Sequence, residues 1–155
     1  NTCFGIENAK MTSLLPLEGL ETITMDGVHY EAFNTSGGLG TMGYGYPAAI
    51  GAQLGRPGET VVCIDGDGSF QMTMTELTTA AYYKVPVKLV IMDNSHHGMV
   101  RQWQQIFYGG RYSHSELESS NPDFVKMAES YGAIGYRATN RAELDDALQK
   151  MMQET

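Results

Sequence analysis

Two short apolar segments, each followed at once by a polar loop, constrain the fold of this 155-residue chain more than any other feature. Residues 60–64 (TVVCI) lead into 65–69 (DGDGS), and residues 85–92 (VPVKLVIM) lead into 93–98 (DNSHHG). A short β-branched run that ends at turn-forming residues predicts a buried strand. The connection between the two runs is long enough for a crossover helix, so we expect the two strands to be parallel.

Helical patterns surround these two segments. Pro47 begins a run of small residues that predicts a helix to Leu54, and Thr73 with Glu76 matches a capping box that predicts a helix to Tyr83. The sequence also predicts helices at 99–107, at 121–132 and after Asn140, and a third short strand at 134–138. Alternating strands and helices predict an α/β fold, a doubly wound parallel sheet with helices on both faces.

Composition and charge argue against several functions. The chain has 18 Asp and Glu against 10 Lys and Arg, a net charge of -8, which argues against nucleic acid as a partner. No apolar stretch reaches the roughly 18 residues of a membrane span, and the N-terminal residues lack the pattern of a signal or transit peptide. We therefore expect a cytoplasmic protein with no membrane partner. Cys63 lies within an apolar run, which predicts a buried, reduced thiol.

A glycine-rich segment, residues 36–45 (SGGLGTMGYG), lies upstream of both predicted strands. A backbone with so few side chains allows a ligand to approach closely. In parallel α/β sheets, ligands bind beyond the carboxyl ends of the strands. Loops 65–69 and 93–98 both lie at that position, so together they predict one binding site.

Asp67 and Asn94 give this site a defined chemistry. They are 94 − 67 = 27 positions apart, at the ends of successive strands, so their oxygens are expected to lie side by side. Carboxylate, amide and backbone carbonyl oxygens suit Mg²⁺ when a phosphate completes the octahedron. The amides of Gly68 and Ser69 are placed to face phosphate oxygens. Asp-Gly and Asp-Asn pairs are also common in ordinary turns, and the paired spacing is what favours a site.

Other chemistries have less support. His96 and His97 lack the second Cys/His pair expected of a zinc site. Ser69 lies outside any G-x-S-x-G nucleophile elbow, and the chain has no Walker A phosphate loop. Met42 and Met99 are either flexible core filling or an apolar shelf beneath a flat heterocycle.

The motifs around this site resemble a known family. Gly-Asp-Gly-Ser at 66–69, followed by Asn94, resembles the Mg²⁺-diphosphate signature of thiamine-diphosphate enzymes. The region from Thr35 to Met152 resembles the C-terminal, diphosphate-binding domain of acetolactate synthase (acetohydroxyacid synthase) catalytic subunits. The further matching segments are 35–45 (TSGGLGTMGYG), 70–72 (FQM), 98–104 (GMVRQWQ), 107–108 (FY), 111–114 (RYSH) and 121–124 (NPDF).

The resemblance implies a role for each residue of the metal-diphosphate site. Mg²⁺ would be bound by the side chains of Asp67 and Asn94 and by the backbone carbonyl of His96. Gly68 and Ser69 would hold the diphosphate. The fold implied is the thiamine-diphosphate-binding fold, with thiamine diphosphate and Mg²⁺ as cofactors.

The same resemblance implies contacts to the rest of the cofactor. Gly40 and Met42 would contact the aminopyrimidine, and Met42 would hold the cofactor in its bent shape. His97, Gly98 and Met99 would line the cofactor loop.

The implied activity is carboligation in branched-chain amino acid biosynthesis. Pyruvate would be decarboxylated, and the two-carbon unit joined to a second pyruvate or to 2-oxobutanoate. Trp103 would wall the substrate channel, although a core tryptophan is an alternative interpretation. The family's activating glutamate belongs to a separate pyrimidine-binding domain that no segment of this chain matches, so no catalytic residue is predicted here.

The resemblance also bears on organisation and partners. We expect residues 35–155 to form the cofactor-binding domain and residues 1–34 to form an atypical segment before it. Within that segment, residues 23–29 (ITMDGVH) resemble the family's first strand and phosphate loop. The connection that the family places between this loop and the Ser-Gly-Gly segment is missing. Full-length relatives carry FAD and are expected to form a homodimer or tetramer with a regulatory subunit. We expect a fragment of such an enzyme, inactive alone. The alternatives are a split-subunit 2-keto acid decarboxylase that needs a partner chain, and a non-catalytic module.

Overall fold

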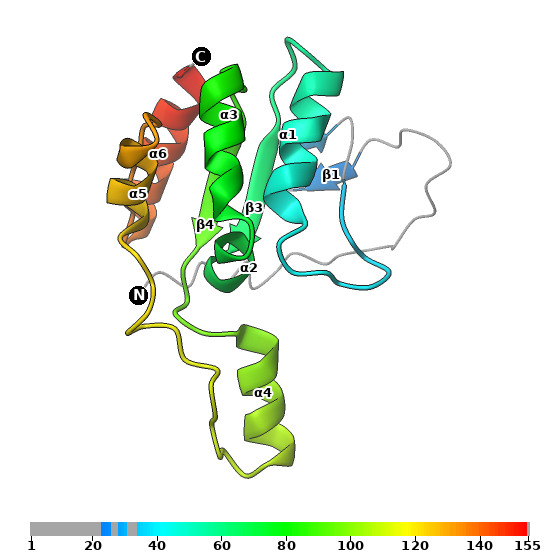
Figure 1. Cartoon of the computed structure of the whole chain (residues 1–155), viewed down its shortest axis with the longest axis vertical. Helices are drawn as coiled ribbons and strands as arrows, with labels where there is room; N and C mark the ends of the chain where they lie inside the picture. Colours follow the sequence, from blue (N-terminus) through cyan, green and yellow to red (C-terminus); the bar gives the residue numbers. More distant parts are fainter. Residues whose placement is uncertain (1–22, 26–27, 31–33, 155) are drawn as a thin grey trace.

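A parallel pair of strands lies at the centre of the computed structural model, which describes residues 23–25, 28–30 and 34–154 (Figure 1). Strand β3 (Val62–Gly66) pairs with β4 (Lys88–Met92) along its whole length. The predicted α/β fold with a parallel sheet is therefore confirmed, and the two carboxyl ends meet at one edge of the sheet.

Helices form in every region where the sequence predicts one, and a further short helix forms at 67–71, where the sequence predicts a loop. They are α1 (Gly45–Gly55), α2 (Asp67–Gln71), the 3₁₀ turn η1 (Met74–Glu76), α3 (Leu77–Tyr83), α4 (Gly98–Phe107), α5 (Phe124–Ser130) and α6 (Arg141–Gln153). Figure 1 shows α4 projecting from the rest of the domain. Within the described ranges, no helix is long and apolar enough to cross a lipid bilayer.

The two faces of β3 differ. Cys63 and Asp65 point into the protein, whereas Val62 and Ile64 are 43% and 59% exposed. Helix cover on both faces is thus not seen at this strand among the described residues. The predicted buried thiol is confirmed, because Cys63 is free and 5% exposed. Burial, together with the nearby carboxylate of Asp65, raises its pKa to about 11.

Phe70 is the centre of the hydrophobic core. It is 0% exposed and belongs to α2, which starts immediately after β3. Its ring meets Tyr46 of α1 edge to face, with centroids 5.5 Å apart, and lies 6.1 Å from the ring of Phe124 in α5. Aromatic packing of this kind fixes both distance and orientation. Phe70 therefore holds α2, and the polar residues at its start, against α1 and α5.

The predicted capping box at Thr73 is wrong. The Thr73 hydroxyl donates to the carbonyl of Gly43 at 3.0 Å, and neither Thr73 nor Glu76 makes a side-chain cap. The Thr73 hydroxyl, which the local pattern assigned to helix capping, thus bonds to the distant Gly43. Residues 74–76 form a 3₁₀ turn that leads into α3.

Residues 134–138, expected as a third strand, do not form one. Arg137 is instead paired with Asp123, at the start of α5, at 2.7 Å. The segment lines a cavity of about 690 Å³ that is bounded by β4, α5 and α6. The segment packs against α5 at Gly135, where an added Cβ would lie 3.0 Å from the Cα of Val125.

The first strand expected from the sequence also pairs differently. Strand β1 (Ile23–Met25) pairs antiparallel with β2 (Val28–Tyr30), as a sheet separate from β3 and β4. Most of residues 1–33 lie outside the described residues, so the boundary at residue 34 stays a prediction.

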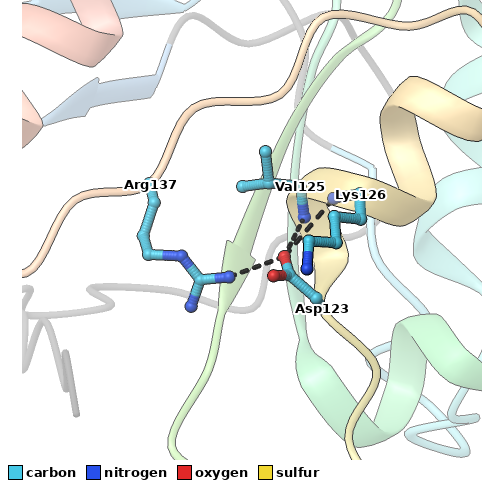
Figure 2. A network of polar contacts seen from close by, with 4 residues as sticks. All are labelled: Asp123, Val125, Lys126 and Arg137. Carbon is cyan, nitrogen blue, oxygen red and sulfur yellow. Dashed lines mark hydrogen bonds and ion pairs between the residues drawn. The ribbon is translucent and has the colours of Figure 1, made fainter.

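Side chains cap the last two helices; the cap of α6 is the one predicted, whereas α5 begins at Phe124 and not at the predicted Asn121. Asn140 accepts the backbone N–H of Glu143 at 3.0 Å, as predicted for the start of α6. Figure 2 shows the corresponding cap of α5, where Asp123 Oδ1 accepts from Val125 N (3.1 Å), Lys126 N (3.3 Å) and Arg137 Nη2 (2.7 Å). The Lys126 backbone hydrogen bond, and to a lesser degree the Arg137 charge, hold the pKa of Asp123 below its ordinary value.

This cap predicts a pH-dependent loss of stability in Asp123→Asn. Because the folded-state pKa is lowered, the ionised Asp123 stabilises the fold above its unfolded pKa, and that contribution disappears as pH falls through the folded value. We expect the variant to melt slightly below wild type at pH 7 and to converge with it in acid, measured by circular dichroism; the effect is small because Asn also caps helices and the Arg137 pair is exposed. Asp145→Asn, in an exposed pair with Arg141, is the control and should change little. A difference that does not vary with pH would contradict this account.

Candidate functional site

A cavity of about 180 Å³ lies at the carboxyl ends of β3 and β4. All three predicted metal-binding residues line it, namely Asp67, Asn94 and His96. So do six of the predicted cofactor-binding residues: Met42, Gly68, Ser69, His97, Gly98 and Met99. The structure thus brings together residues from three separate segments of the chain.

Asp67 is held in place by the end of β3 and the start of α2. It follows Gly66 directly and is 2% exposed, although it is a carboxylate. Its Oδ2 accepts a hydrogen bond from Nδ2 of Asn121 at 2.8 Å. Carboxylates are rarely so buried unless they are paired or bind a metal, so this residue marks a site.

The loop after β4 is folded tightly around Asn94. Its Oδ1 accepts the backbone N–H of His96 at 2.9 Å. Nδ1 of His96 lies 2.8 Å from the carbonyl oxygen of Asn94, and Arg101 of α4 contacts Nε2 of the same ring, an arrangement in which Nδ1 carries the proton. An amide oxygen has two lone pairs, so Asn94 Oδ1 retains the capacity to bind a cation.

A brace that the sequence analysis missed supports this loop. The backbone N–H of His97 donates to Ser115 O at 2.8 Å, and that of Leu117 donates to Ser95 O at 2.7 Å. Ser115 is 1% exposed, and its hydroxyl donates to Gln104 of α4 at 2.7 Å. Residues 108–120 look irregular in the sequence, and no local pattern signals this pairing.

The glycine-rich loop reaches the cavity because its Gly43 peptide is held from both sides. Its N–H donates to the Ser69 hydroxyl at 3.0 Å, and its carbonyl accepts from Thr73. The backbone of Gly43 has φ +81°, which side-chain-bearing residues rarely adopt. These bonds place the neighbouring Met42 at the cavity.

Gly68 and His97 pack directly against each other in the lining of the cavity. A Cβ added at Gly68 would lie 2.7 Å from Nδ1 of His97, so the imidazole occupies the space that any larger residue would need. The same Nδ1 is buried and has no hydrogen-bond partner. A buried, unpartnered ring nitrogen needs an explanation, and a ligand oxygen would satisfy it.

Gly40 and Trp103 are not brought to the cavity. Gly40 lies in the turn that its N–H closes with Ser36 O at 2.6 Å. Trp103 lies on α4, 57% exposed, and its ring packs 5.1 Å from that of Phe107. The interpretation of Trp103 as a core tryptophan is therefore wrong. Core filling is also wrong for Met42 and Met99, whose exposed fractions are 41% and 74%.

The donor set fits a hard cation held jointly with a ligand. Among residues 23–25, 28–30 and 34–154, no group of three or more His, Cys, Asp or Glu side chains could hold a metal ion alone. The cavity instead offers one carboxylate, one amide oxygen and the backbone of the 94–98 loop. Oxygen atoms of this kind suit Mg²⁺, which keeps several positions for water or phosphate.

Comparison with known proteins agrees with this geometry. Residues 22–155 match the family described as "Thiamine pyrophosphate enzyme, C-terminal TPP binding domain". A solved structure, the Rhodococcus jostii RHA1 thiamine diphosphate-dependent 4-hydroxybenzoylformate decarboxylase, is similar with a TM-score of 0.67 at 34% identity, covering 73% of this chain and 21% of that one.

Curated relatives are more similar in sequence. The acetolactate synthase large subunit of Pyropia yezoensis is 56% identical over 115 residues, which is 74% of this chain and 20% of that protein. The acetolactate synthase isozyme 2 large subunit of Escherichia coli (strain K12) is 51% identical over 122 residues, which is 79% of this chain and 22% of that protein. The mitochondrial acetolactate synthase catalytic subunit of Saccharomyces cerevisiae is 53% identical over 120 residues, which is 77% of this chain and 17% of that protein. This chain spans about a fifth of the length of such relatives.

The contact between Gly68 and His97 predicts a local effect of Gly68→Ala. The new methyl group must displace the imidazole, so the NMR signals of His97 and of the 95–98 amides should shift while Phe70 keeps the core folded. Gly51→Ala, in α1 with nothing within 4 Å of the added Cβ, is the matched control. It should leave the His97 signals unchanged and preserve or raise the melting temperature, because Ala is favoured over Gly within a helix. Unchanged His97 signals in Gly68→Ala would contradict the contact.

Proposed function

This chain belongs to the thiamine pyrophosphate enzymes, matching their C-terminal cofactor-binding domain over residues 22–155, and on that premise we propose that its cavity binds Mg²⁺ and the diphosphate of thiamine diphosphate. The observation that carries the proposal is the convergence of buried Asp67 with the 94–98 loop at the ends of β3 and β4. The predicted diphosphate-binding residues Gly68 and Ser69 line the same cavity.

Each side of the cavity has its own task in this proposal. Asp67, Asn94 and the backbone carbonyl of His96 hold the cation, which neutralises the diphosphate. The amides of Gly68 and Ser69 bind phosphate oxygens. Charge pairing in a site shielded from water is stronger than in bulk solvent, so the buried position of Asp67 favours tight binding of the cation.

The remaining residues orient the organic part of the cofactor. Met42 and Met99 provide apolar surface against the aminopyrimidine and the neighbouring ring, and Gly98 lets the backbone approach. Gly40 and Trp103 would join the site through the glycine-rich loop and α4, respectively. When bound, thiamine diphosphate supplies the electron sink for decarboxylation of a 2-keto acid.

For the complete enzyme we propose acetolactate synthase activity. Relatives bearing that name are 49–56% identical over segments of 113–122 residues. The substrates would be pyruvate with a second pyruvate or 2-oxobutanoate, for branched-chain amino acid synthesis. This chain spans about a fifth of those relatives, so in this proposal the activating glutamate comes from a pyrimidine-binding domain that this chain does not match. The proposed complete enzyme also carries FAD, is located in the cytoplasm, and forms a homodimer or tetramer with a regulatory subunit.

A second candidate is a split-subunit 2-keto acid decarboxylase whose partner chain carries the glutamate. The similarity to a solved decarboxylase at 34% identity favours the decarboxylase chemistry, but this chain covers only 21% of that chain, and the acetolactate synthases are more alike in sequence. The two candidates differ in whether a separate glutamate-bearing chain copurifies with this one.

The proposal predicts Mg²⁺-dependent binding of thiamine diphosphate that requires Asp67. In titration calorimetry, the chain should bind the cofactor weakly with Mg²⁺ present and more weakly still without it, because only half of the cofactor's contacts are available. Asp67→Ala should lower the affinity at least tenfold, roughly the effect of disturbing a metal's surroundings. The isosteric Asp67→Asn covers the case in which the alanine variant fails to fold, and Asp145→Asn is the control for a lost surface charge. A cofactor affinity that changes neither on removal of Mg²⁺ nor on substitution of Asp67, or no binding at all, would contradict the proposed site.

A further inference from the structure

Asn121 connects the two strand-end loops of the site, although it lies far from both in sequence. Its Nδ2 donates to Asp67 Oδ2 at 2.8 Å and to Asp93 Oδ1 at 3.0 Å. One carboxylate follows β3 and the other follows β4. A single amide group therefore connects the carboxyl ends of the two strands.

The orientation of this amide is fixed by Gln71 at the end of α2. Gln71 Nε2 donates to Asn121 Oδ1 at 2.8 Å and to the carbonyl of Asp67 at 3.2 Å. With its oxygen facing a donor, Asn121 turns its nitrogen to the two carboxylates. The opposite orientation would set an oxygen against two acids, so this assignment is the one that satisfies all four groups.

Asp93 connects Asn121 to the loop that carries Asn94. Its Oδ1 accepts both the backbone N–H of Ser95, at 3.1 Å, and the Ser95 hydroxyl, at 3.2 Å. Asn121, Asp93 and Ser95 thus form a continuous chain of hydrogen bonds. Two carboxylates that share one nitrogen repel each other, and the N–H groups between them offset that repulsion.

The backbone of Asn121 is held from both directions. Its N–H donates to Leu117 O at 2.8 Å, in the segment that braces the His97 loop. On the other side, Pro122 and the Asp123 cap of Figure 2 lead into α5, whose Phe124 packs against Phe70. Asn121 is therefore placed by the core and not by the site itself.

From this geometry we propose that Asn121 is a positioning residue that sets the spacing between Asp67 and the 93–96 loop, and so the affinity for Mg²⁺ with its diphosphate. It acts through Asp67 and Asp93. The consequence for Mg²⁺ rests on the function proposed above, whereas the clamp itself can be tested on the chain without cofactor.

The first test is amide hydrogen exchange in Asn121→Asp. This near-isosteric change replaces the shared donor with a third carboxylate, so protection of the Ser95 and His96 amides should fall at least tenfold. Asn140→Asp makes the same chemical change at the exposed cap of α6, where Asp also caps well, and should leave both amides unchanged. Asn121→Leu, which removes the donor without adding charge, serves if the aspartate variant fails to fold. Unchanged protection at Ser95 and His96 would overturn the clamp.

The second test measures the Mg²⁺ concentration that half-saturates binding of thiamine diphosphate. We expect it to rise about 10- to 100-fold in Asn121→Asp and to stay unchanged in Asn140→Asp. A residue with only a structural role would lower the melting temperature without moving this value. Altered exchange with an unaltered Mg²⁺ requirement would overturn the positioning role. A wild-type chain that binds no cofactor would instead contradict the proposed function, while the exchange experiment would still decide the clamp.

Discussion

The parallel pairing of β3 with β4 determines where every group of the site lies. Because Gly66 is opposite Met92 in the register, the next residues of the two strands emerge together at one edge of the sheet. Asp67 starts α2 there and Asp93 starts the loop that carries Asn94. Phe70, fully buried three positions after Asp67, ties α2 to α1 and α5. A change in this register would move the two sides of the cavity apart.

This arrangement gathers acidic groups in a small space. Asp65 and Asp67 are 9% and 2% exposed, and Asp93 shares a hydrogen-bond donor with Asp67. Oδ2 of Asp65 is buried without a hydrogen-bond partner, and the charge of this residue adds to the raised pKa of Cys63. Buried negative charges are costly unless donors or a cation compensate them. Asn121 compensates Asp67 and Asp93 in part, and a divalent cation bound with a diphosphate beside Asp67 is a chemically suitable source of the rest.

Local patterns sufficed to predict the parts of the fold that local forces determine. Apolar runs that end in polar loops predicted β3 and β4, and the spacing of Asp67 and Asn94 predicted that both would line one cavity. Predictions failed where a distant partner competes with the local one. Thr73 bonds to Gly43 in place of capping a helix, and the expected strand 134–138 packs against α5 at Gly135 without joining the sheet. Asn121 was predicted only as a helix start and as part of a matching segment, because its carboxylate partners lie 28 and 54 positions away.

The central claim is that both strand-end loops bind one cation together with a diphosphate. The most direct measurement is an amide NMR spectrum of the chain with thiamine diphosphate, in which Mg²⁺ is replaced stepwise by a small amount of paramagnetic Mn²⁺. The account predicts selective broadening of signals from residues 66–69 and 94–98, while those of α6 stay sharp. Broadening of one loop without the other, or broadening centred on the exposed acids of α6, would contradict it.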